Sequence, residues 1–423
     1  MISCAASIMV YAGEPLSFIK EHTEPVIEMR EILRDSISKL EKWVEGHNYK
    51  GYEPFDGLSS FLRPLTFSNL FLDRLLLQLV RQSPINLRPL LGVKPLDSTI
   101  GRGYMAWGYC HMYKLTGNGR YKEKAVSCLE WLIKNKSLGC DEYAWGKHFD
   151  FASRSGLYKA LEPILIWSAL IAHAFLEAYE LFNDSRYLAV ADSVCLWIVK
   201  LPRNQTDSGF CMGYHNHDFT ATIHNSNMVG ASVLARTARH NGNQEYLAVA
   251  KEAMTYSCSK QLPNGAWLYG EDRQNHWIDN FHTGYNLDSL KCYAESTGSR
   301  EFEFQLNKGL EFYKANFFEE NGRPKYYHNR VYPVDSQCVS QAIDTLANFS
   351  EYDESSLEQA LKVAKWTINN MQDKDGHFYY RQYPVIKAKT PMLHWAQATM
   401  YKALTNLFLR ITMRGKSEFN NFT

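Results

Sequence analysis

Apolar residues recur along the chain with helical spacing, in segments that come in pairs. In residues 284–296, Leu287, Leu290 and Ala294 fall at i, i+3 and i+7, which is the spacing of one face of an α-helix. After a short turn, the same spacing resumes over residues 302–313. This pattern predicts a helical hairpin.

The hairpin is one unit of an internal repeat. The sequence Tyr-Leu-Ala-Val-Ala occurs twice, beginning at Tyr187 and at Tyr246. An aromatic residue closes each unit at intervals of 53 to 66 residues, at Trp131, Trp197, Tyr256, Tyr313 and Trp366. Because one hairpin cannot bury its apolar face alone, the units are expected to stack in series.

The end of the chain favours a closed ring over an open stack. Residues 399–409 form a further apolar helical pattern, whereas an open solenoid ends in a polar capping repeat. We therefore predict an all-α fold, an (α/α)6 toroid of helical hairpins with short β-hairpin loops at one end. No Pro-, Ser- or Gly-rich linker divides the chain, so we expect a single toroid domain over residues 1–423, with residues 1–30 as an N-terminal extension.

Composition narrows the range of partners. The 423 residues include 46 basic and 45 acidic side chains. This balance gives no indication of a basic surface for nucleic acid or for an anionic membrane, so we expect neither partner. The nine cysteines include no Cys-x-x-Cys pair, which argues against a disulfide framework and favours a reducing compartment. The apolar N-terminus lacks a basic region, and no apolar run approaches the length of a membrane span, so we expect a cytoplasmic protein without one.

Long loops follow the second helix of each hairpin, and all should emerge at the same end of the ring. They are rich in aromatic and titratable residues, and the richest covers residues 266–284. Paired aromatics also suit β-hairpins by propensity alone, but hairpins do not need so many titratable groups. The candidate site residues in or beside these loops are Asp56, Trp145, His148, Asp150, His215, His217, Asp218, His224, Asn225, Trp267, Trp277, Asp279, His282, Tyr327, His328, Arg330, Asp335, Tyr380, Arg381 and His394.

Two short segments carry a resemblance to known proteins. They are Tyr-Glu-Pro-Phe-Asp-Gly at residues 52–57 and Trp-Ile-Asp-Asn-Phe-His-Thr-Gly at residues 277–284. Together with the repeat, they resemble the six-hairpin glycosidase superfamily and, within it, the VpsJ-type polysaccharide-biosynthesis proteins. The resemblance covers about residues 31–409 and implies a role in surface-glycan metabolism. The full histidine pattern of the related sugar 2-epimerases is not found.

Aromatic platforms beside Asp, Asn, His and Arg suit a carbohydrate ligand, because sugars offer both apolar faces and hydroxyls. Hydrolysis needs two carboxyl groups flanking the scissile bond, and five loop aspartates are available for it. Elimination or epimerisation needs a base and groups that stabilise an anion. His224 with Asn225, and Tyr327 with His328 and Arg330, offer that set.

A metal site is a third possibility, because His215 and His217 would share one face of a strand, with Asp218 beside them and His224 following. Histidines in an aromatic loop more often serve as hydrogen-bonding partners, so we expect no metal. Gly101-Arg-Gly103 precedes a predicted helix but follows no predicted strand, so it is no dinucleotide fingerprint and we expect no cofactor.

These observations predict a carbohydrate-active protein of surface-polysaccharide metabolism that cleaves a glycosidic linkage by general acid/base chemistry. The expected catalytic residues are Asp279, His282, Asp218, Asp335 and Tyr327, and the other candidates would bind an oligosaccharide or polysaccharide substrate. One alternative is a lyase or epimerase acting on a uronic-acid-containing glycan, and another is a non-catalytic glycan-binding protein. For Asp279 itself, the alternative to a catalytic role is that of a helix cap.

Overall fold

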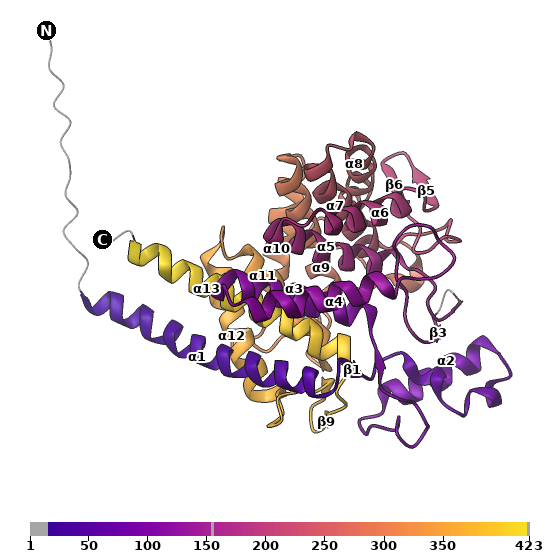
Figure 1. Cartoon of the computed structure of the whole chain (residues 1–423), viewed down its shortest axis with the longest axis horizontal. Helices are drawn as coiled ribbons and strands as arrows, with labels where there is room; N and C mark the ends of the chain where they lie inside the picture. Colours follow the sequence, from indigo (N-terminus) through magenta and orange to yellow (C-terminus); the bar gives the residue numbers. More distant parts are fainter. Residues whose placement is uncertain (1–15, 154–155, 421–423) are drawn as a thin grey trace, which may run out of the picture.

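A ring of six inner helices forms the centre of the protein. The computed structural model describes residues 16–153 and 156–420 (Figure 1). Each inner helix contacts the next, and the last contacts the first, so the ring is closed. The inner helices are α3 (Thr99–Thr116), α5 (Leu165–Phe182), α7 (His224–Asn241), α9 (Asn280–Thr297), α11 (Ser336–Phe349) and α13 (Thr399–Asn420). The predicted all-α toroid is confirmed.

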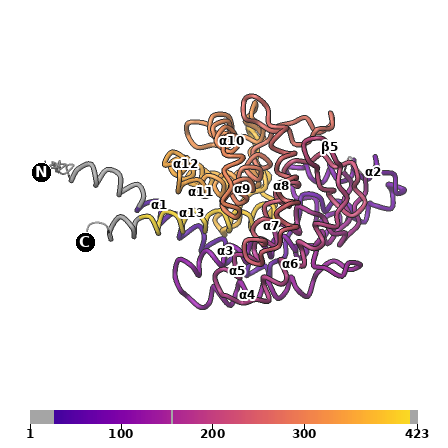
Figure 2. Tube along the Cα trace, turned by 90° about the horizontal axis from the view of Figure 1, so that it is seen from above, coloured from indigo at the N-terminus to yellow at the C-terminus, as the bar shows by residue number. Residues whose placement is uncertain are grey.

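An outer helix packs against each inner one. Five of them follow their inner partners in sequence: α4 (Gly119–Lys134), α6 (Ser185–Val199), α8 (Gln244–Ser259), α10 (Glu303–Asn316) and α12 (Glu354–Met371). The sixth outer helix, α1 (Leu16–Gly46), packs beside α13 (Figure 2). Of the N-terminal extension predicted over residues 1–30, residues 1–15 lie outside the described residues, and the rest belongs to α1.

The inner and outer helices of a hairpin are joined by a repeated tight turn. Gly117 and Gly242 end α3 and α7 in the left-handed conformation, with φ of 68° and 74°, which glycine adopts without strain. The next residues, Asn118 and Asn243, cap the following helices by accepting backbone N–H bonds through their side chains. In these two hairpins, and in that of α5 and α6, two residues separate the inner helix from its outer partner, whereas the turns over residues 298–302 and 350–353 are longer.

The long loops lie at the opposite end of the ring from these turns, as predicted. They contain short antiparallel pairs: β1 (Lys50–Gly51) with β2 (Leu96–Asp97), β3 (Phe151–Ala152) with β4 (Leu157–Tyr158), β5 (Arg203–Thr206) with β6 (Gly209–Met212), and the sheet of β7 (Val334–Asp335), β8 (Arg381–Gln382) and β9 (Lys387–Ala388). The predicted short β-hairpins are not regular in every loop: residues 265–270 and 322–330 form no strand pair, and isolated backbone bridges join Ile223 with Gly270, Asp279 with Tyr327 and Tyr327 with Arg330.

The loop between α1 and α3 carries a separate small structure at this end of the ring (Figure 1). It contains the 3-10 helices η1 (Asp56–Ser59) and η2 (Arg63–Thr66) and the helix α2 (Leu70–Gln82). Leu58, Leu76, Leu77 and Val80 form its own apolar cluster together with Ala152. We call residues 57–96 the α2 lobe; the sequence patterns above did not predict it.

One helix of the described residues, α5, is long and apolar enough to cross a membrane by length and composition. It is an inner helix, and 72% of it is buried within the protein. Its apolar character is that of a core helix, since a helix surrounded by neighbours needs no polar face.

Candidate functional site

A carboxylate and a histidine form a close pair where α9 begins. The Asp279 carboxylate accepts the backbone N–H of His282 at 3.0 Å and the ring Nδ1–H at 2.6 Å. The Trp277 indole N–H donates to the same carboxylate at 2.8 Å. Asp279 is therefore both the N-cap of α9 and the group that orients the His282 ring. The two sequence-based interpretations of Asp279 are compatible.

A second pair repeats this geometry at the start of the helical segment η4 (Leu393–Ala398), which leads into α13. Glu53 accepts the backbone N–H of His394 at 3.1 Å and its Nδ1–H at 2.5 Å. A carboxylate on Nδ1 fixes the tautomer in which Nε2 is the acceptor. No described residue is hydrogen-bonded to Nε2 of His282 or His394, so both atoms are available to a substrate.

An aromatic wall connects the two histidines. The Phe281 ring lies 3.8 Å from the His282 ring and 5.6 Å from the Trp395 ring, measured between centroids. Trp395 in turn lies 5.5 Å from His394. Phe281 is buried and Trp395 is half-buried, so the two imidazoles lie beside one run of aromatic rings, of which Trp395 keeps exposed surface of the kind on which a sugar ring stacks.

Lys147 lies in an aromatic cage next to His394. Its ammonium is 3.4 Å from the ring centroid of Phe151, 4.7 Å from Phe55 and 5.2 Å from Trp167, and Trp167 stands edge-on to His394. No described residue accepts a hydrogen bond from this ammonium. Burial lowers the pKa of Lys147 to about 7, with Glu53 acting in the opposite direction.

Lys147 was not among the residues selected from the sequence, although it lies in one of the aromatic loops. Its signal was a lysine flanked by aromatic residues in the run Tyr-Ala-Trp-Gly-Lys-His-Phe at residues 143–149. A buried amine whose pKa is displaced by its surroundings is one of the features of a functional group.

Asp335 orients the aromatic wall from behind. It caps α11 through the backbone N–H of Gln337 and accepts Trp395 Nε1–H at 2.7 Å and Arg381 Nε–H at 2.5 Å. Asp335 and Arg381 are buried. The predicted catalytic Asp335 therefore lies behind Trp395, with its oxygens already accepting three donors.

Other predicted residues lie around the site in supporting positions. Asp56 is buried against Arg88 at 2.7 Å, and burial raises its pKa to about 6 although Arg88 opposes the change. Asp150 pairs with Arg63 at 2.7 Å. Asp218 accepts two backbone N–H groups of its own turn. These carboxylates hold the α2 lobe and the loops in place.

Several predicted binding residues lie in the core, which the sequence did not reveal. Trp145 and Trp267 are buried, and their indole N–H groups donate to Leu132 O and Ser257 O. They pack the helices instead of offering a sugar platform, because hairpin loops must also bury aromatic residues. His224, Asn225 and Tyr380 are buried as well, and His148 is partly buried beside Trp131.

A groove of about 340 Å³ lies between two loops beside the first pair. It brings together the predicted residues Trp277, Tyr327, His328 and Arg330. Since Trp277 also donates to Asp279, this groove adjoins the His282 end of the aromatic wall.

The histidines considered as metal ligands do not converge. His224 is hydrogen-bonded to Glu271 at 2.8 Å, whereas His215 stands edge-on to Tyr158. Nowhere in residues 16–153 and 156–420 do three His, Cys, Asp or Glu side chains form a group that fits a metal ion.

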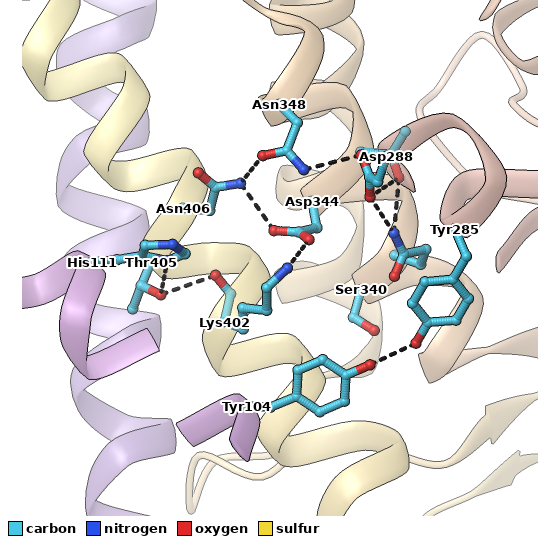
Figure 3. Close-up of polar contacts among 12 residues, drawn as sticks. Tyr104, His111, Tyr285, Asp288, Ser340, Asp344, Asn348, Lys402, Thr405 and Asn406 are labelled. Carbon is cyan, nitrogen blue, oxygen red and sulfur yellow. Dashed lines mark hydrogen bonds and ion pairs between the residues drawn. The ribbon is translucent and has the colours of Figure 1, made fainter. Parts of the chain in front are cut away.

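A second cavity, of about 250 Å³, lies between the inner helices on the side of the short turns. Figure 3 shows its polar network: Lys402 pairs with Asp344, Asn406 donates to Asp344 and Asn348 donates to Asp288. These groups satisfy one another, and they join α9, α11 and α13.

A separate hydrogen bond of 2.7 Å joins the hydroxyls of Tyr104 and Tyr285 in the same cavity and connects α3 with α9 (Figure 3). The polar groups of this cavity are largely committed to one another, whereas His282, His394 and Lys147 keep unused hydrogen-bonding capacity. We therefore place the candidate active site at the loop end.

Comparison with solved structures confirms the fold. The chain is similar to a sugar epimerase from a ruminal bacterium, with a TM-score of 0.58, 14% identity, and coverage of 75% of this chain and 88% of the other. It is similar to an α-mannanase of Bacteroides thetaiotaomicron, with a TM-score of 0.57, 11% identity, and coverage of 76% and 88%. It is also similar to a polysaccharide lyase, with a TM-score of 0.57, 12% identity, and coverage of 92% and 98%.

No protein-family model matches the sequence, and no curated protein does either. The resemblance to the six-hairpin glycosidase superfamily is confirmed as a likeness of fold. The narrower resemblance to VpsJ-type proteins stays a prediction.

Proposed function

We propose that this protein is a carbohydrate-active enzyme that moves a proton at a sugar carbon, as an epimerase or isomerase does. The observation that carries the proposal is the pair of carboxylate-oriented histidines, His282 and His394, on one aromatic wall. Two such groups allow one to remove a proton from a carbon and the other to return a proton to its opposite face. The sequence-based alternative was a lyase or epimerase acting on a uronic-acid-containing glycan; this proposal takes epimerisation ahead of glycoside cleavage, at a carbon next to an aldehyde.

The state of the carboxylates supports this order. Hydrolysis needs one carboxyl group protonated and in reach of the leaving oxygen. Glu53, Asp279 and Asp335 each accept two or three N–H donors within the protein. A carboxylate in that role orients its donors and has little capacity to donate a proton to a substrate.

The reaction proceeds with one histidine neutral and the other protonated. Nε2 of the neutral ring takes the proton from the carbon next to the aldehyde of an open-chain sugar. The C–H electron pair forms the C=C bond of an enediolate, and the carbonyl oxygen takes the negative charge. The protonated ring then delivers its proton to the opposite face of that carbon, which restores the aldehyde and gives the epimer. Delivery to the former carbonyl carbon gives the ketose isomer instead, with the proton of the neighbouring hydroxyl passing to the former carbonyl oxygen as the new C=O bond forms. Lys147, which contacts the same Trp167 ring as His394, would stabilise the enediolate oxygen in this reaction.

Deuterium incorporation tests the proposal. A panel of reducing sugars and oligosaccharides is incubated with the enzyme in deuterated water and followed by nuclear magnetic resonance. We expect deuterium at the carbon next to the carbonyl, and loss of the signal in His282→Ala and in His394→Ala. Release of new reducing ends without deuterium incorporation would instead identify a glycoside hydrolase.

One observation favours a lyase as the second candidate. The ammonium of Lys147 has no carboxylate partner among the described residues, so it is available to the carboxylate of a uronic acid. Neutralising that carboxylate acidifies the adjacent C–H, and a histidine base would then begin a β-elimination. Ultraviolet absorbance from an unsaturated uronic-acid product, in the absence of epimerisation, would identify this reaction.

A further inference from the structure

Exposed apolar side chains are concentrated in the α2 lobe. Of the nineteen large hydrophobic residues that are exposed in the described chain, ten lie in residues 61–96. These ten are Phe61, Leu65, Phe67, Leu70, Phe71, Leu75, Leu79, Ile85, Leu90 and Leu96. Phe67 is 83% exposed and Leu90 is 75% exposed. Scattered single residues of this kind need no explanation, but a contiguous group indicates an interaction surface.

The helix α2 is apolar on two opposite faces. Leu76, Leu77 and Val80 point into the small cluster of the lobe. Phe71, Leu75 and Leu79, spaced at i, i+4 and i+8, point outward and are 70%, 47% and 61% exposed. A helix that is apolar on both faces is expected to have a partner on each. The inner partner is the lobe itself.

The charge of the lobe indicates what covers the outer face. Residues 57–96 carry five basic side chains and one acidic one, Asp73. Three of the basic side chains are engaged within the protein: Arg88 is buried against Asp56, Arg63 is paired with Asp150, and Arg81 contacts Tyr380 and Phe55. Asp73 is buried and accepts the Thr66 hydroxyl at 2.5 Å, so the lobe surface presents no carboxylate. The remaining two are Lys94, which is exposed, and Arg74 of α2, which is half-buried. The exposed charge of the lobe is therefore positive, although basic and acidic residues are balanced at 46 and 45 in the whole chain.

We infer that the α2 lobe docks the protein on an anionic lipid surface, with α2 lying in the plane of the membrane. With thirteen residues, α2 is about 20 Å long and too short to span a bilayer of about 30 Å. Apolar side chains beside cations are the features of an interfacial helix. A second copy fits less well, because its lobe would bring the same cations and no carboxylate to meet them.

Docking by this surface would hold the candidate site close to the membrane. The lobe begins just after Glu53, the partner of His394, and Arg63 of the lobe is paired with Asp150 of the next loop. The proposal goes beyond the proposed function, because it concerns where the enzyme works and needs no activity to be tested.

Vesicle co-sedimentation tests the inference with the full chain. Vesicles of phosphatidylcholine are compared with vesicles that contain about one third phosphatidylglycerol. We expect binding to the anionic vesicles and at least tenfold weaker binding to the neutral ones. The variant Phe71→Ser/Leu75→Ser/Leu79→Ser should bind the anionic vesicles at least tenfold more weakly, and Lys94→Glu should also weaken binding.

A matched control removes three exposed apolar residues outside the lobe, in Leu138→Ser/Phe219→Ser/Phe304→Ser. This variant should bind vesicles as the parent does. Equal loss in both triple variants, or no binding of the parent, would overturn the inference. A concentration-dependent dimer in light scattering that the lobe variant abolishes, without vesicle binding, would show that the partner is a second copy and would overturn the lipid assignment.

Discussion

Replacing Lys147 by Met should make the protein more stable while impairing its function. The ammonium is buried among aromatic rings and has no hydrogen-bond acceptor in the described residues, and burial lowers its pKa from 10.5 to about 7. Because each factor of ten in an equilibrium constant is worth ~1.4 kcal/mol, this displacement corresponds to a penalty of ~5 kcal/mol at most. Contacts with the three aromatic rings offset about 0.5–2 kcal/mol of it.

The direction of the stability change and its pH range follow from the pKa of Lys147 in the folded and in the unfolded chain. Below about pH 7 the amine is charged in both the folded and the unfolded chain, so the penalty is fully present. Between pH 7 and 10.5 the unfolded chain binds a proton that the folded chain lacks, so the wild type gains stability as the pH rises. We therefore expect Lys147→Met to raise the free energy of unfolding by ~3 kcal/mol near pH 6 and by ~1 kcal/mol near pH 9.5.

Urea denaturation followed by circular dichroism at both pH values measures this difference. Lys374→Met serves as the control, because Lys374 is exposed and its replacement should leave stability within about 0.5 kcal/mol at either pH. A Lys147→Met variant that is less stable than the wild type near pH 6, or whose gain does not shrink with pH, would refute the reasoning.

Three further predictions follow from the contacts described above. Asp279→Asn keeps a capping side chain but removes the charge that orients His282, so turnover should fall by about a hundredfold or more. The free energy of unfolding should change by no more than about 2 kcal/mol. Near-normal initial rates would contradict the orienting role of Asp279. Asp344→Asn should destabilise the protein by about 3–5 kcal/mol because Lys402 stays buried without its charged partner. In urea denaturation, the double variant Asp344→Leu/Lys402→Met should recover most of this loss. A double variant as unstable as the single one would be inconsistent with the pairing. Acidic oligosaccharides should bind more tightly than neutral ones through Lys147, with a difference that shrinks as salt is added during calorimetric titration; equal affinities would argue against an anionic ligand.

The sequence predicted the ring because its determinants are local and repeated. The turn residues Gly117 and Asn118 have counterparts in later hairpins, and helical spacing is readable in any one of them. The α2 lobe escaped prediction because it occurs once and has no repeat to reveal it. The resemblance found in the sequence also located Glu53 within its first motif, although Glu53 was not selected.

The candidate site was predictable only in part, because its key contacts join distant segments. The pair of Asp279 and His282 is three residues apart and could be inferred from one loop. The pair of Glu53 and His394 is 341 residues apart, so no local pattern reveals it. In the sequence, Trp145 cannot be told apart from a tryptophan that stacks on a sugar. Only its burial in the structure shows that it belongs to the core.

The way in which α1 and α13 share the last hairpin has a consequence for how the protein is made. A linear stack of repeats can lose its terminal unit and keep the others packed. In this ring, α13 contacts α1, α3 and α11. The apolar faces of α1 and α3 that pack against α13 therefore stay uncovered until α13 is present. Ribosomal synthesis reaches α13 after all the other helices of the ring, so the nascent ring stays open at this position until α13 has been made.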